Sequence, residues 1–322
     1  MSPTVASIDF GGTKTMVGLV NAQGEVLQRE GFPTPQNPDP HAFFELCREK
    51  IGLCLRRQGW AFTEVEAVGV TVPGYTDRSG ERLIRSHVPP WKNVAVGAIL
   101  GDIFPGVPVK AANDVNACAL GELRFNPTVP RDFLWVTVST GIGGAAVADG
   151  MLLAGAHGMA GEFGHMAVEY SRPRPCNCGG KGCLEAHASG RAMAARLREK
   201  LALGELPGFL RWLQSHGAEP DMKAASEALR EGVSEAQALF DEAGMYLGRG
   251  FASLCNALDP EAIYIGGGMG LSLAHMLPAI EKEMTGAVVG GRHVPVLCTA
   301  LGYDAGLLGG AALGIQALEQ RR

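Results

Sequence analysis

The sequence predicts an α/β protein made of two related halves. Two apolar, strand-like runs, Val5–Ile8 and Thr15–Val20, flank a glycine-containing turn near the N-terminus. The same arrangement returns about 130 residues later, where Phe133–Val138 and Ala145–Ala148 flank a second glycine-rich turn. Repetition of one strand–turn–strand unit, with helix and strand patterns in between, is typical of two similar α/β domains. We therefore expect a ligand cleft between the two halves.

Helix and strand patterns alternate between the two hairpins. Apolar residues recur at helical spacing over Pro40–Gln58, and Val65–Val72 is an apolar run that ends at Pro73-Gly74. Val107–Ala112 predicts another short strand, and Val115–Arg124 predicts the helix that follows it. The chain therefore contains the strands and crossover helices that an α/β domain needs.

Asn113 and Asp114 lie at the junction of this short strand and its helix. Open α/β sheets bind ligands at the ends of their strands, which favours a site role for Asp114. Asn and Asp are also frequent N-caps of helices. The position alone leaves both interpretations open.

The C-terminal half is rich in helical patterns. They cover Leu184–Leu203, Ser234–Leu258 and Leu307–Gln320, whereas residues 204–232 have the weakest periodicity. Pro260–Gly270 reads as a strand that ends in a glycine cluster and leads into a helix. Such a junction lets a nucleotide approach backbone N–H groups closely.

Composition excludes several classes of protein. The 322 residues are 46% apolar, which allows a sizeable core and about two domains. A net charge of −5 and a pI near 5.9 argue against a general affinity for nucleic acid or anionic membrane. No apolar run approaches a membrane span, and no signal peptide is evident, so we expect a cytoplasmic protein.

The glycine turns of both hairpins are candidate phosphate-binding loops. Gly11, Gly12 and Gly141 lack a Cβ, so backbone N–H groups there can come close to phosphate oxygens. Both turns join two strands and lack the G-x-G-x-x-G spacing, which excludes a dinucleotide-binding fingerprint. For either hairpin taken alone, an ordinary glycine-containing β-turn is the alternative.

Three cysteines and a histidine have the spacing of a zinc site. Cys176, Cys178 and Cys183 follow His165 within nineteen residues. Three thiolates and one imidazole are typical of a closed structural site with no open position for water. The alternatives are a cluster of free thiols or a redox pair formed by Cys176 and Cys178, although redox pairs usually have the Cys-x-x-Cys spacing. We expect the other cysteines to be reduced core residues: Cys47, Cys54, Cys118, Cys255 and Cys298.

Together, these motifs resemble the ROK family of bacterial sugar kinases and sugar-responsive repressors. The resemblance covers residues 9 to about 268 and is carried by Asp9-Phe-Gly-Gly-Thr-Lys14, Val72-Pro-Gly74, Asn113 to Glu122, Ser139-Thr-Gly-Ile-Gly-Gly144, Gly161-Glu-Phe-Gly-His165, Cys176 to Glu185 and Ile265-Gly-Gly-Gly268. It implies an actin-like, hexokinase-type ATPase fold with two related α/β domains and a cleft between them. The implied domains are residues 1–115, joined by a returning C-terminal helix at about 306–322, and residues 116–305 with the zinc-stapled loop.

The resemblance also implies a role for each residue of the site. Asp114 is the expected catalytic base. The expected sugar-binding residues are Gly74, Asn113, Asp114, Glu162, His165 and Glu185. The expected ATP and phosphate contacts are Asp9, Gly11, Gly12, Thr13, Lys14, Thr140, Gly141, Gly267 and Gly268. The expected zinc ligands are His165, Cys176, Cys178 and Cys183.

These residue types suit phosphoryl transfer to a sugar. Such a reaction needs positioning and charge stabilisation more than covalent chemistry. Asp114 can accept the proton of the sugar's primary hydroxyl, and Asp9 can hold Mg²⁺ through water. Glu162 and Glu185 can accept hydrogen bonds from vicinal hydroxyls, with a solvated surface carboxylate as the alternative for Glu162. One nitrogen of His165 can bind zinc while the other donates to the sugar.

We therefore expect an ATP-dependent kinase acting on the 6-hydroxyl of a hexose, with glucose favoured. The alternatives are a kinase of N-acetylglucosamine or N-acetylmannosamine, or a fructokinase. A non-catalytic sugar-sensing protein is the alternative of another class, but only eight residues precede Asp9, and no helix-turn-helix fits there. We expect sugar and ATP as small-molecule partners, Mg²⁺ and structural Zn²⁺ as cofactors, and a homodimer without nucleic acid or membrane.

Overall fold

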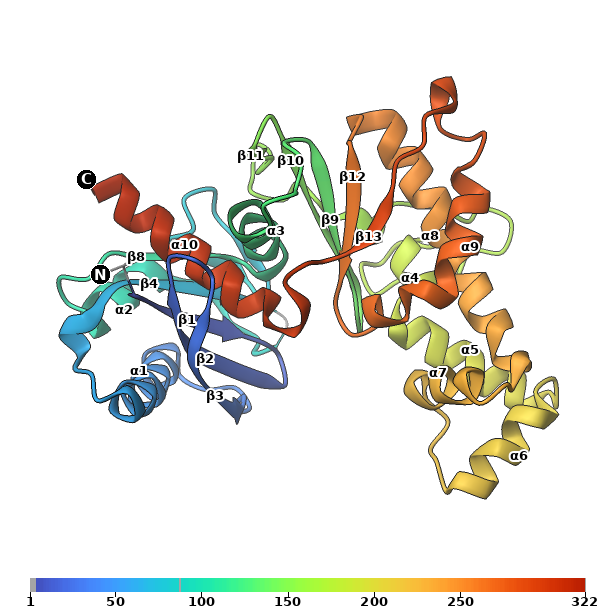
Figure 1. Ribbon diagram of the computed structural model, residues 1–322, viewed down its shortest axis with the longest axis horizontal. Coiled ribbons are helices and arrows are strands. Elements are labelled where there is room, and N and C mark those ends of the chain that lie inside the picture. The colour runs from blue at the N-terminus through green and yellow to red at the C-terminus, as the bar shows by residue number, and fades with distance from the viewer. Residues whose placement is uncertain (1–3, 87, 322) are drawn as a thin grey trace. The chain divides into compact units, whose positions relative to one another are not determined.

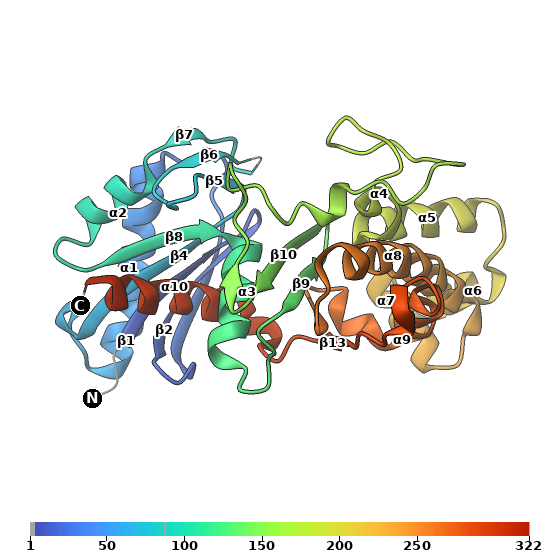
Figure 2. The ribbon, with the colours of Figure 1, turned by 90° about the horizontal axis from the view of Figure 1, so that it is seen from above.

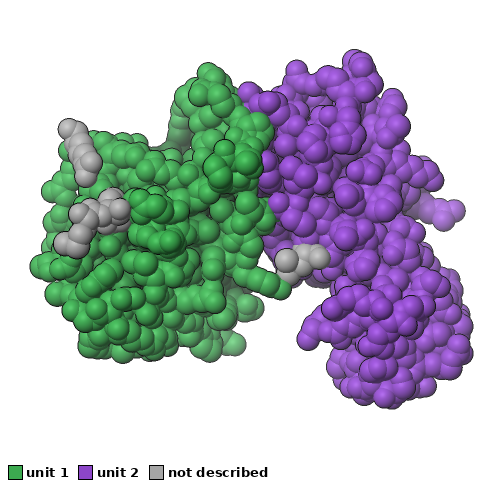
Figure 3. Space-filling model, viewed as in Figure 1, with its two compact units in different colours: residues 1–131, 145–161, 299–322 green, residues 132–144, 162–298 purple. Residues whose placement is uncertain are grey.

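The computed structural model describes residues 4–86 and 88–321. The chain forms two compact units, shown in Figure 3. Unit 1 contains residues 1–131, 145–161 and 299–322, and unit 2 contains residues 132–144 and 162–298. The domain limits drawn from the sequence, near residues 115 and 305, stay a prediction. None of the helices in residues 4–86 and 88–321 has the length and apolarity that crossing a membrane requires.

Unit 1 is built on a five-stranded sheet (Figure 1). Its strands, in the spatial order β3-β2-β1-β4-β8, are β3 (Val26–Pro33), β2 (Lys14–Asn21), β1 (Thr4–Phe10), β4 (Val65–Val72) and β8 (Val109–Asn113). β1 pairs antiparallel with β2 and parallel with β4, and β4 pairs parallel with β8. A second, three-stranded sheet contains β5 (Tyr75–Thr76), β6 (Leu83–Arg85) and β7 (Lys92–Val94).

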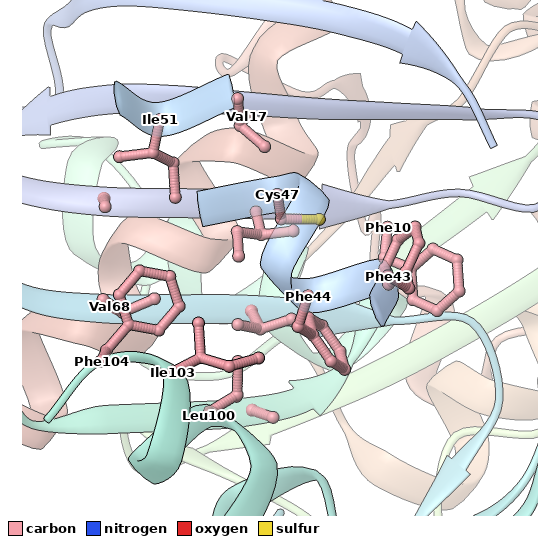
Figure 4. Close-up of a cluster of buried hydrophobic side chains, with 14 of the residues drawn as sticks. Phe10, Val17, Phe43, Phe44, Cys47, Ile51, Val68, Leu100, Ile103 and Phe104 are labelled. Carbon is pink, nitrogen blue, oxygen red and sulfur yellow. The ribbon is translucent and has the colours of Figure 1, made fainter. Parts of the chain in front are cut away.

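Alternation along β1 sends its side chains to two covered faces of the sheet. Ile8 and Phe10 pack with Phe43 and Phe44 in a core formed with α1 (Pro40–Gln58) and α2 (Val96–Ile103), part of which is drawn in Figure 4. Ser7 and Asp9 point to the other face. Two helices lie there, α3 (Asp114–Phe125) and α10 (Ala305–Arg321), and Figure 2 shows α10 running across the strands.

Unit 2 is organised around the other five-stranded sheet. The strands of this sheet, in the order β11-β10-β9-β12-β13, are β11 (Met151–Leu152), β10 (Ile142–Ala148), β9 (Phe133–Val138), β12 (Ala262–Gly266) and β13 (Val296–Cys298). β12 is parallel to both β9 and β13, and β11 with the end of β10 groups with unit 1. The helices of unit 2 are α4 (Leu184–Ala188), α5 (Gly190–Ala202), α6 (Pro207–His216), α7 (Met222–Arg230), α8 (Gln237–Leu258) and α9 (Leu273–Met284).

The structure confirms the predicted strands and helices, with one main difference. The helix predicted over Leu184–Leu203 is broken into α4 and α5 at Ser189, which has an extended backbone. The Ser189 hydroxyl accepts from the backbone N–H of Ala192 and so caps α5. Apolar spacing alone cannot reveal this break, because both helices keep the same periodicity. The weakly periodic region 204–232 contains α6 and α7.

Candidate active site

The first hairpin turn is held in shape by Thr34, which follows β3. The Thr34 hydroxyl donates to the carbonyl of Gly11 at 2.7 Å, and its backbone N–H donates to the carbonyl of Thr13 at 3.0 Å. A Cβ at Gly11 would lie 2.6 Å from the carbonyl oxygen of Lys14, so the turn requires glycine there. Thr13 and Lys14 are exposed at its tip. The turn thus presents a fixed backbone to a ligand.

Asp9 stands at the end of β1, opposite Thr71 of β4. The Thr71 hydroxyl donates to Asp9 Oδ1 at 3.0 Å. Burial raises the pKa of the Asp9 carboxyl, and the Thr71 hydrogen bond lowers it. A Cβ at Gly306 would overlap the Asp9 carboxylate, so this carboxylate lies directly against the first turn of α10. The positive end of a helix dipole favours a negative charge at that position.

Asn113 is the N-cap of α3, whereas the sequence left open a site role or a capping role for Asp114. Its side-chain oxygen accepts from the backbone N–H groups of Val115 and Asn116 at 3.0 and 3.1 Å. Its amide nitrogen donates to the carbonyl of Gly74 at 3.0 Å and to Asp114 Oδ1 at 2.9 Å. Asn113 therefore joins the start of α3 to the turn after β4 and orients the neighbouring carboxylate.

Asp114 is the first residue of α3. Burial raises the pKa of the Asp114 carboxyl to about 6, although the backbone N–H of Val115, which donates to Oδ1 at 2.9 Å, opposes this shift. The negative charge of Asp9 raises the same pKa further. A carboxyl with a pKa near 6 is ionised at neutral pH and is still basic enough to accept a proton.

Gly74 has a backbone that other residues rarely adopt, with φ at +143°. A Cβ there would overlap the carbonyl oxygen of Arg85. Glycine at this position lets the chain turn sharply from β4 into β5, with its carbonyl directed at Asn113.

The second hairpin turn is clamped by the helices that follow the cysteine segment. Glu185 Oε2 accepts from the backbone N–H of Ile142 at 3.0 Å, and the carbonyl of Ser139 accepts from Gly190 N–H at 2.7 Å. A Cβ at Gly141 would lie 2.5 Å from Glu185 Oε2. Glu185 therefore supports the Thr140–Gly141 turn with one of its oxygens. The other, Oε1, lies 3.5 Å from Arg191.

The glycine cluster after β12 lies beside this turn. Gly267 has φ at +83°, and a Cβ there would lie 2.7 Å from the carbonyl oxygen of Val138, the last residue of β9. The backbone N–H of Met269 donates to the same carbonyl at 2.9 Å. No atom lies within 4 Å of the position that a Cβ would take on Gly268, so this backbone is open to a ligand.

The four predicted zinc ligands come together in unit 2. Their ligand atoms all lie within 4.8 Å of one another, with His165 Nδ1 3.6 Å from Cys176 Sγ and Cys178 Sγ 3.7 Å from Cys183 Sγ. Zinc–sulfur bonds of about 2.3 Å in a tetrahedron place neighbouring ligands about 3.8 Å apart, so these separations fit zinc. The backbone N–H of Gly180 lowers the pKa of the Cys178 thiol, which favours the thiolate that binds metal.

The two nitrogens of His165 face different partners. Nδ1 belongs to the cysteine cluster, whereas Nε2 lies 3.7 Å from Glu162 Oε2. Glu162 is partly exposed, with 42% of its side chain accessible, so its carboxylate can also reach a ligand. A metal on Nδ1 would fix the ring and leave Nε2–H as a donor next to this carboxylate.

Comparison with known proteins decides the family. The ROK family model matches residues 5–317. The chain belongs to the ROK family. It is 32% identical over 313 residues to the N-acetylmannosamine kinase of Salmonella heidelberg (strain SL476), covering 96% of this chain and 98% of that protein.

Solved ROK structures confirm the predicted ATPase fold. The structure of a ROK family glucokinase from Streptomyces griseus, in complex with glucose and AMPPNP, matches with a TM-score of 0.82 and 30% identity, covering 97% of this chain and 99% of that one. A ROK family transcriptional regulator, a homologue of the E. coli MLC protein, matches with a TM-score of 0.87 and 26% identity, covering 99% of this chain and 79% of that one.

The predicted site residues of this ROK chain fall into one group in each unit. The group in unit 1 consists of Asp9, Gly11, Gly12, Thr13, Lys14, Gly74, Asn113 and Asp114. The group in unit 2 consists of Thr140, Gly141, Glu162, His165, Cys176, Cys178, Cys183, Glu185, Gly267 and Gly268. Sequence reasoning missed the supporting residues Thr34, Thr71 and Gly306. Of these three, only Gly306 could have been noticed in the sequence. Glycine inside a predicted helix indicates that another group packs closely against it.

Proposed function

We propose that this chain is an ATP-dependent sugar kinase that transfers the γ-phosphoryl group of ATP to the 6-hydroxyl of a hexose, with glucose the favoured substrate. The proposal rests on the hydrogen bonds and the raised pKa of Asp114. Its carboxyl is fixed by Asn113 and by a backbone N–H, and its pKa is raised to about 6. A kinase needs a carboxylate of this kind to accept the proton of the attacking hydroxyl.

The proposed reaction divides the work between the two groups of residues. Asp114 accepts the proton of the sugar hydroxyl as the hydroxyl oxygen bonds to the γ-phosphorus. The bond from this phosphorus to the bridging oxygen breaks, and its electron pair leaves with ADP. The turns at Gly11–Lys14 and Thr140–Gly141 supply backbone N–H and hydroxyl donors to the phosphate oxygens. Asp9 would hold Mg²⁺ through water, and the ion would neutralise charge on those oxygens. Gly267 and Gly268 would admit the adenosine.

The zinc-stapled segment would orient the sugar. His165, Cys176, Cys178 and Cys183 would hold a structural Zn²⁺, which would fix the segment that carries Glu162 and supply no chemistry. Nε2–H of His165 and the carboxylate of Glu162 then offer a donor and an acceptor to neighbouring hydroxyls. Glu185 Oε2 holds the second turn, and Oε1, which pairs with Arg191, is the oxygen that could also accept from a sugar hydroxyl. We expect Gly74 and Asn113 to contact the sugar as well.

The sugar itself is the open part of the proposal. Relatives of similar identity act on different sugars, since an N-acetylmannosamine kinase is 32% identical and a glucokinase 30% identical. N-acetylglucosamine, N-acetylmannosamine and fructose are the alternatives to glucose. Release of ADP from ATP and Mg²⁺ across a panel of these sugars, with Asp114→Asn measured in parallel, tests the proposal. Turnover with one sugar that the variant abolishes supports it, and binding without turnover for every sugar refutes it.

A sugar-sensing protein without kinase activity is the second candidate. The observation in its favour is the TM-score of 0.87 with a transcriptional regulator of the same family. The intact residues Asp9, Thr13 and Asp114 favour the kinase. A sensor would bind sugar and would release no ADP in the unmodified protein.

We further propose that the kinase is a homodimer that binds neither nucleic acid nor membrane. The ROK resemblance supports the dimer, and the net charge of −5 supports the absence of nucleic acid. Light scattering that returned the mass of one 33.8 kDa chain would rule out the dimer.

A further inference from the structure

A cavity of about 370 Å³ lies within unit 1, apart from the residues assigned to the reaction. One wall is β8, which contributes Lys110 and Ala112. Two more walls are α3 and α10, and the segments 76–80 and 150–158 close the remaining sides. A volume of about 300–1,000 Å³ is usual for small-molecule sites, so the cavity suits a compact metabolite.

The two closing segments are packed tightly against the sheet and against each other. Gly80 has φ at +78°, and a Cβ there would overlap the carbonyl oxygen of Ala111 on β8. Gly158 has φ at +73°, and its Cβ would lie 2.7 Å from the carbonyl oxygen of Thr76. Only glycine permits these approaches, so the sequence builds the walls of the cavity with close backbone contacts.

Two cationic side chains and one acid line the cavity. Lys110 is half-buried and Arg78 is exposed at the rim, and neither forms an ion pair with a residue that the structure describes. Burial alone lowers the pKa of Lys110, with no contribution from a nearby carboxylate. Among the lining residues, all of them described, Asp77 is the only acid. Its Oδ1 already accepts from the Ser79 hydroxyl at 3.0 Å and from the Arg82 N–H at 3.2 Å.

Neutral amides and apolar side chains complete the lining, the apolar ones being Leu120, Leu123, Met151, Leu152 and Leu313. Asn116 comes from the first turn of α3, and Gln316 and Gln320 come from one face of α10. Amides of this kind can donate to and accept from hydroxyl groups. A ligand with one compact anionic group and a hydroxylated body would satisfy both the charges and the amides.

We propose that this cavity binds a small phosphorylated metabolite, with its phosphate at Lys110 and Arg78 and its hydroxyls at the amides of α3 and α10. A phosphate carries about two negative charges at neutral pH and so matches two cationic side chains. The proposal does not rest on the kinase assignment, because none of these side chains belongs to the residues proposed for catalysis.

Calorimetric titration of the full chain at constant ionic strength tests the site, with orthophosphate and glucose 6-phosphate as separate probes. We expect both to bind, and tighter binding of glucose 6-phosphate if the amides recognise the hydroxylated body. Lys110→Gln should weaken binding about ten-fold or more, since a charge-assisted hydrogen bond is lost. Ala154→Leu, which fills the cavity without changing its charge, should weaken binding similarly.

Two lysine controls separate this site from other phosphate contacts. Lys92→Gln removes an exposed charge on β7, and Lys14→Gln removes a candidate contact of the first hairpin. Both should leave the affinity of the cavity unchanged. Failure of both probes to bind, or equal affinity in Lys110→Gln and the unmodified protein, would overturn the proposal, whatever the outcome of the kinase assay.

Discussion

Two carboxylates in unit 1 have different proposed roles. Burial raises the pKa of Asp9, against the hydrogen bond from Thr71 and the adjacent first turn of α10, which both favour the ionised form. Burial and the negative charge of Asp9 also raise the pKa of Asp114. Their surroundings therefore shift the pKa of both carboxyl groups in the same direction.

The pKa of Asp114 predicts the acid limb of the pH profile. The base acts only when ionised, and its pKa is raised to about 6. We therefore expect kcat/KM to fall as the pH drops through about 6 and to level off above about 7. Asp114→Asn should lower kcat about 10²–10⁴-fold at every pH, because no proton acceptor remains. If the residual activity of Asp114→Asn still falls as the pH drops through about 6, the group that titrates there is not Asp114.

Gly306 provides a test of the position of Asp9. In Gly306→Ala the new methyl group would overlap the Asp9 carboxylate, so either the carboxylate or the first turn of α10 must move. We expect a loss of about ten-fold or more in kcat/KM for ATP, measured at varied Mg²⁺, because a shift near 1 Å in a site is costly. Gly101→Ala is the control, since no atom within 4 Å faces its Cβ. Unchanged kinetics in Gly306→Ala would remove Asp9 from the metal site.

At the scale of elements, the sequence predicted the features that depend on neighbouring residues, namely helix bounds and hairpin turns. The bounds of α1, Pro40–Gln58, could be read from the sequence, because Asp39 caps its start and Gly59 ends it in a left-handed conformation. The two hairpins were also predictable, since glycine turns between apolar runs are local features.

Contacts between distant segments could not be predicted. The break at Ser189 is accompanied by the bond from Gly190 N–H to the carbonyl of Ser139, about fifty positions earlier. Likewise, no spacing rule links Glu185 to the backbone of Ile142. The proximity of His165, Cys176, Cys178 and Cys183 could be predicted because all four lie in one short segment with metal-ligand spacing.

The packing of α10 on the first sheet depends on glycine. A Cβ at Gly69 of β4 would overlap the carbonyl oxygen of Gly310, and a Cβ at Gly310 would overlap the Ser7 hydroxyl. The Ser7 hydroxyl donates to the carbonyl of Leu307 at 2.6 Å and is itself buried. The helix backbone therefore lies directly on the strands, with no side-chain layer between them.

This close packing predicts a large effect of one methyl group. Gly69→Ala should lower the free energy of unfolding by about 1–3 kcal/mol, because the backbone of α10 must move away from the sheet. Gly101→Ala, in a helix and without neighbours, should raise the same free energy by up to about 1 kcal/mol. Denaturation with urea measures both. Equal stability of the two variants would show that α10 does not lie as closely on β4 as described.

At the scale of the whole molecule, the fold class followed from the repeated hairpin and the ROK resemblance, whereas the composition of the units did not. Segment 145–161 groups with unit 1 because its loop packs on the turn at Thr76, a tertiary contact that no sequence period encodes. Unit 1 carries the proposed base, and unit 2 carries the cysteine–histidine cluster. The β3-β2-β1-β4-β8 sheet lies wholly in unit 1, whereas β11 and the end of β10 are the part of the other five-stranded sheet that groups with unit 1.

Removal of the metal tests how far a change at the cysteine–histidine cluster spreads through the chain. We expect about one zinc per chain, and chelation should loosen the segment that carries His165, Cys176, Cys178 and Cys183, because bonds from one ion to all four side chains would be lost. Glu185 accepts from the backbone N–H of Ile142, so faster hydrogen exchange should appear at residues 162–190 and at the second hairpin turn.

Residues 4–33 of unit 1 should keep their exchange rates, while sugar affinity falls. Cys183→Ser should reproduce the effect of the chelator, and Cys298→Ser, which changes a thiol outside the cluster, should not. Uniformly faster exchange over both units would mean that zinc stabilises the whole chain. Unchanged exchange together with unchanged sugar affinity would mean that the four ligands hold no structural metal.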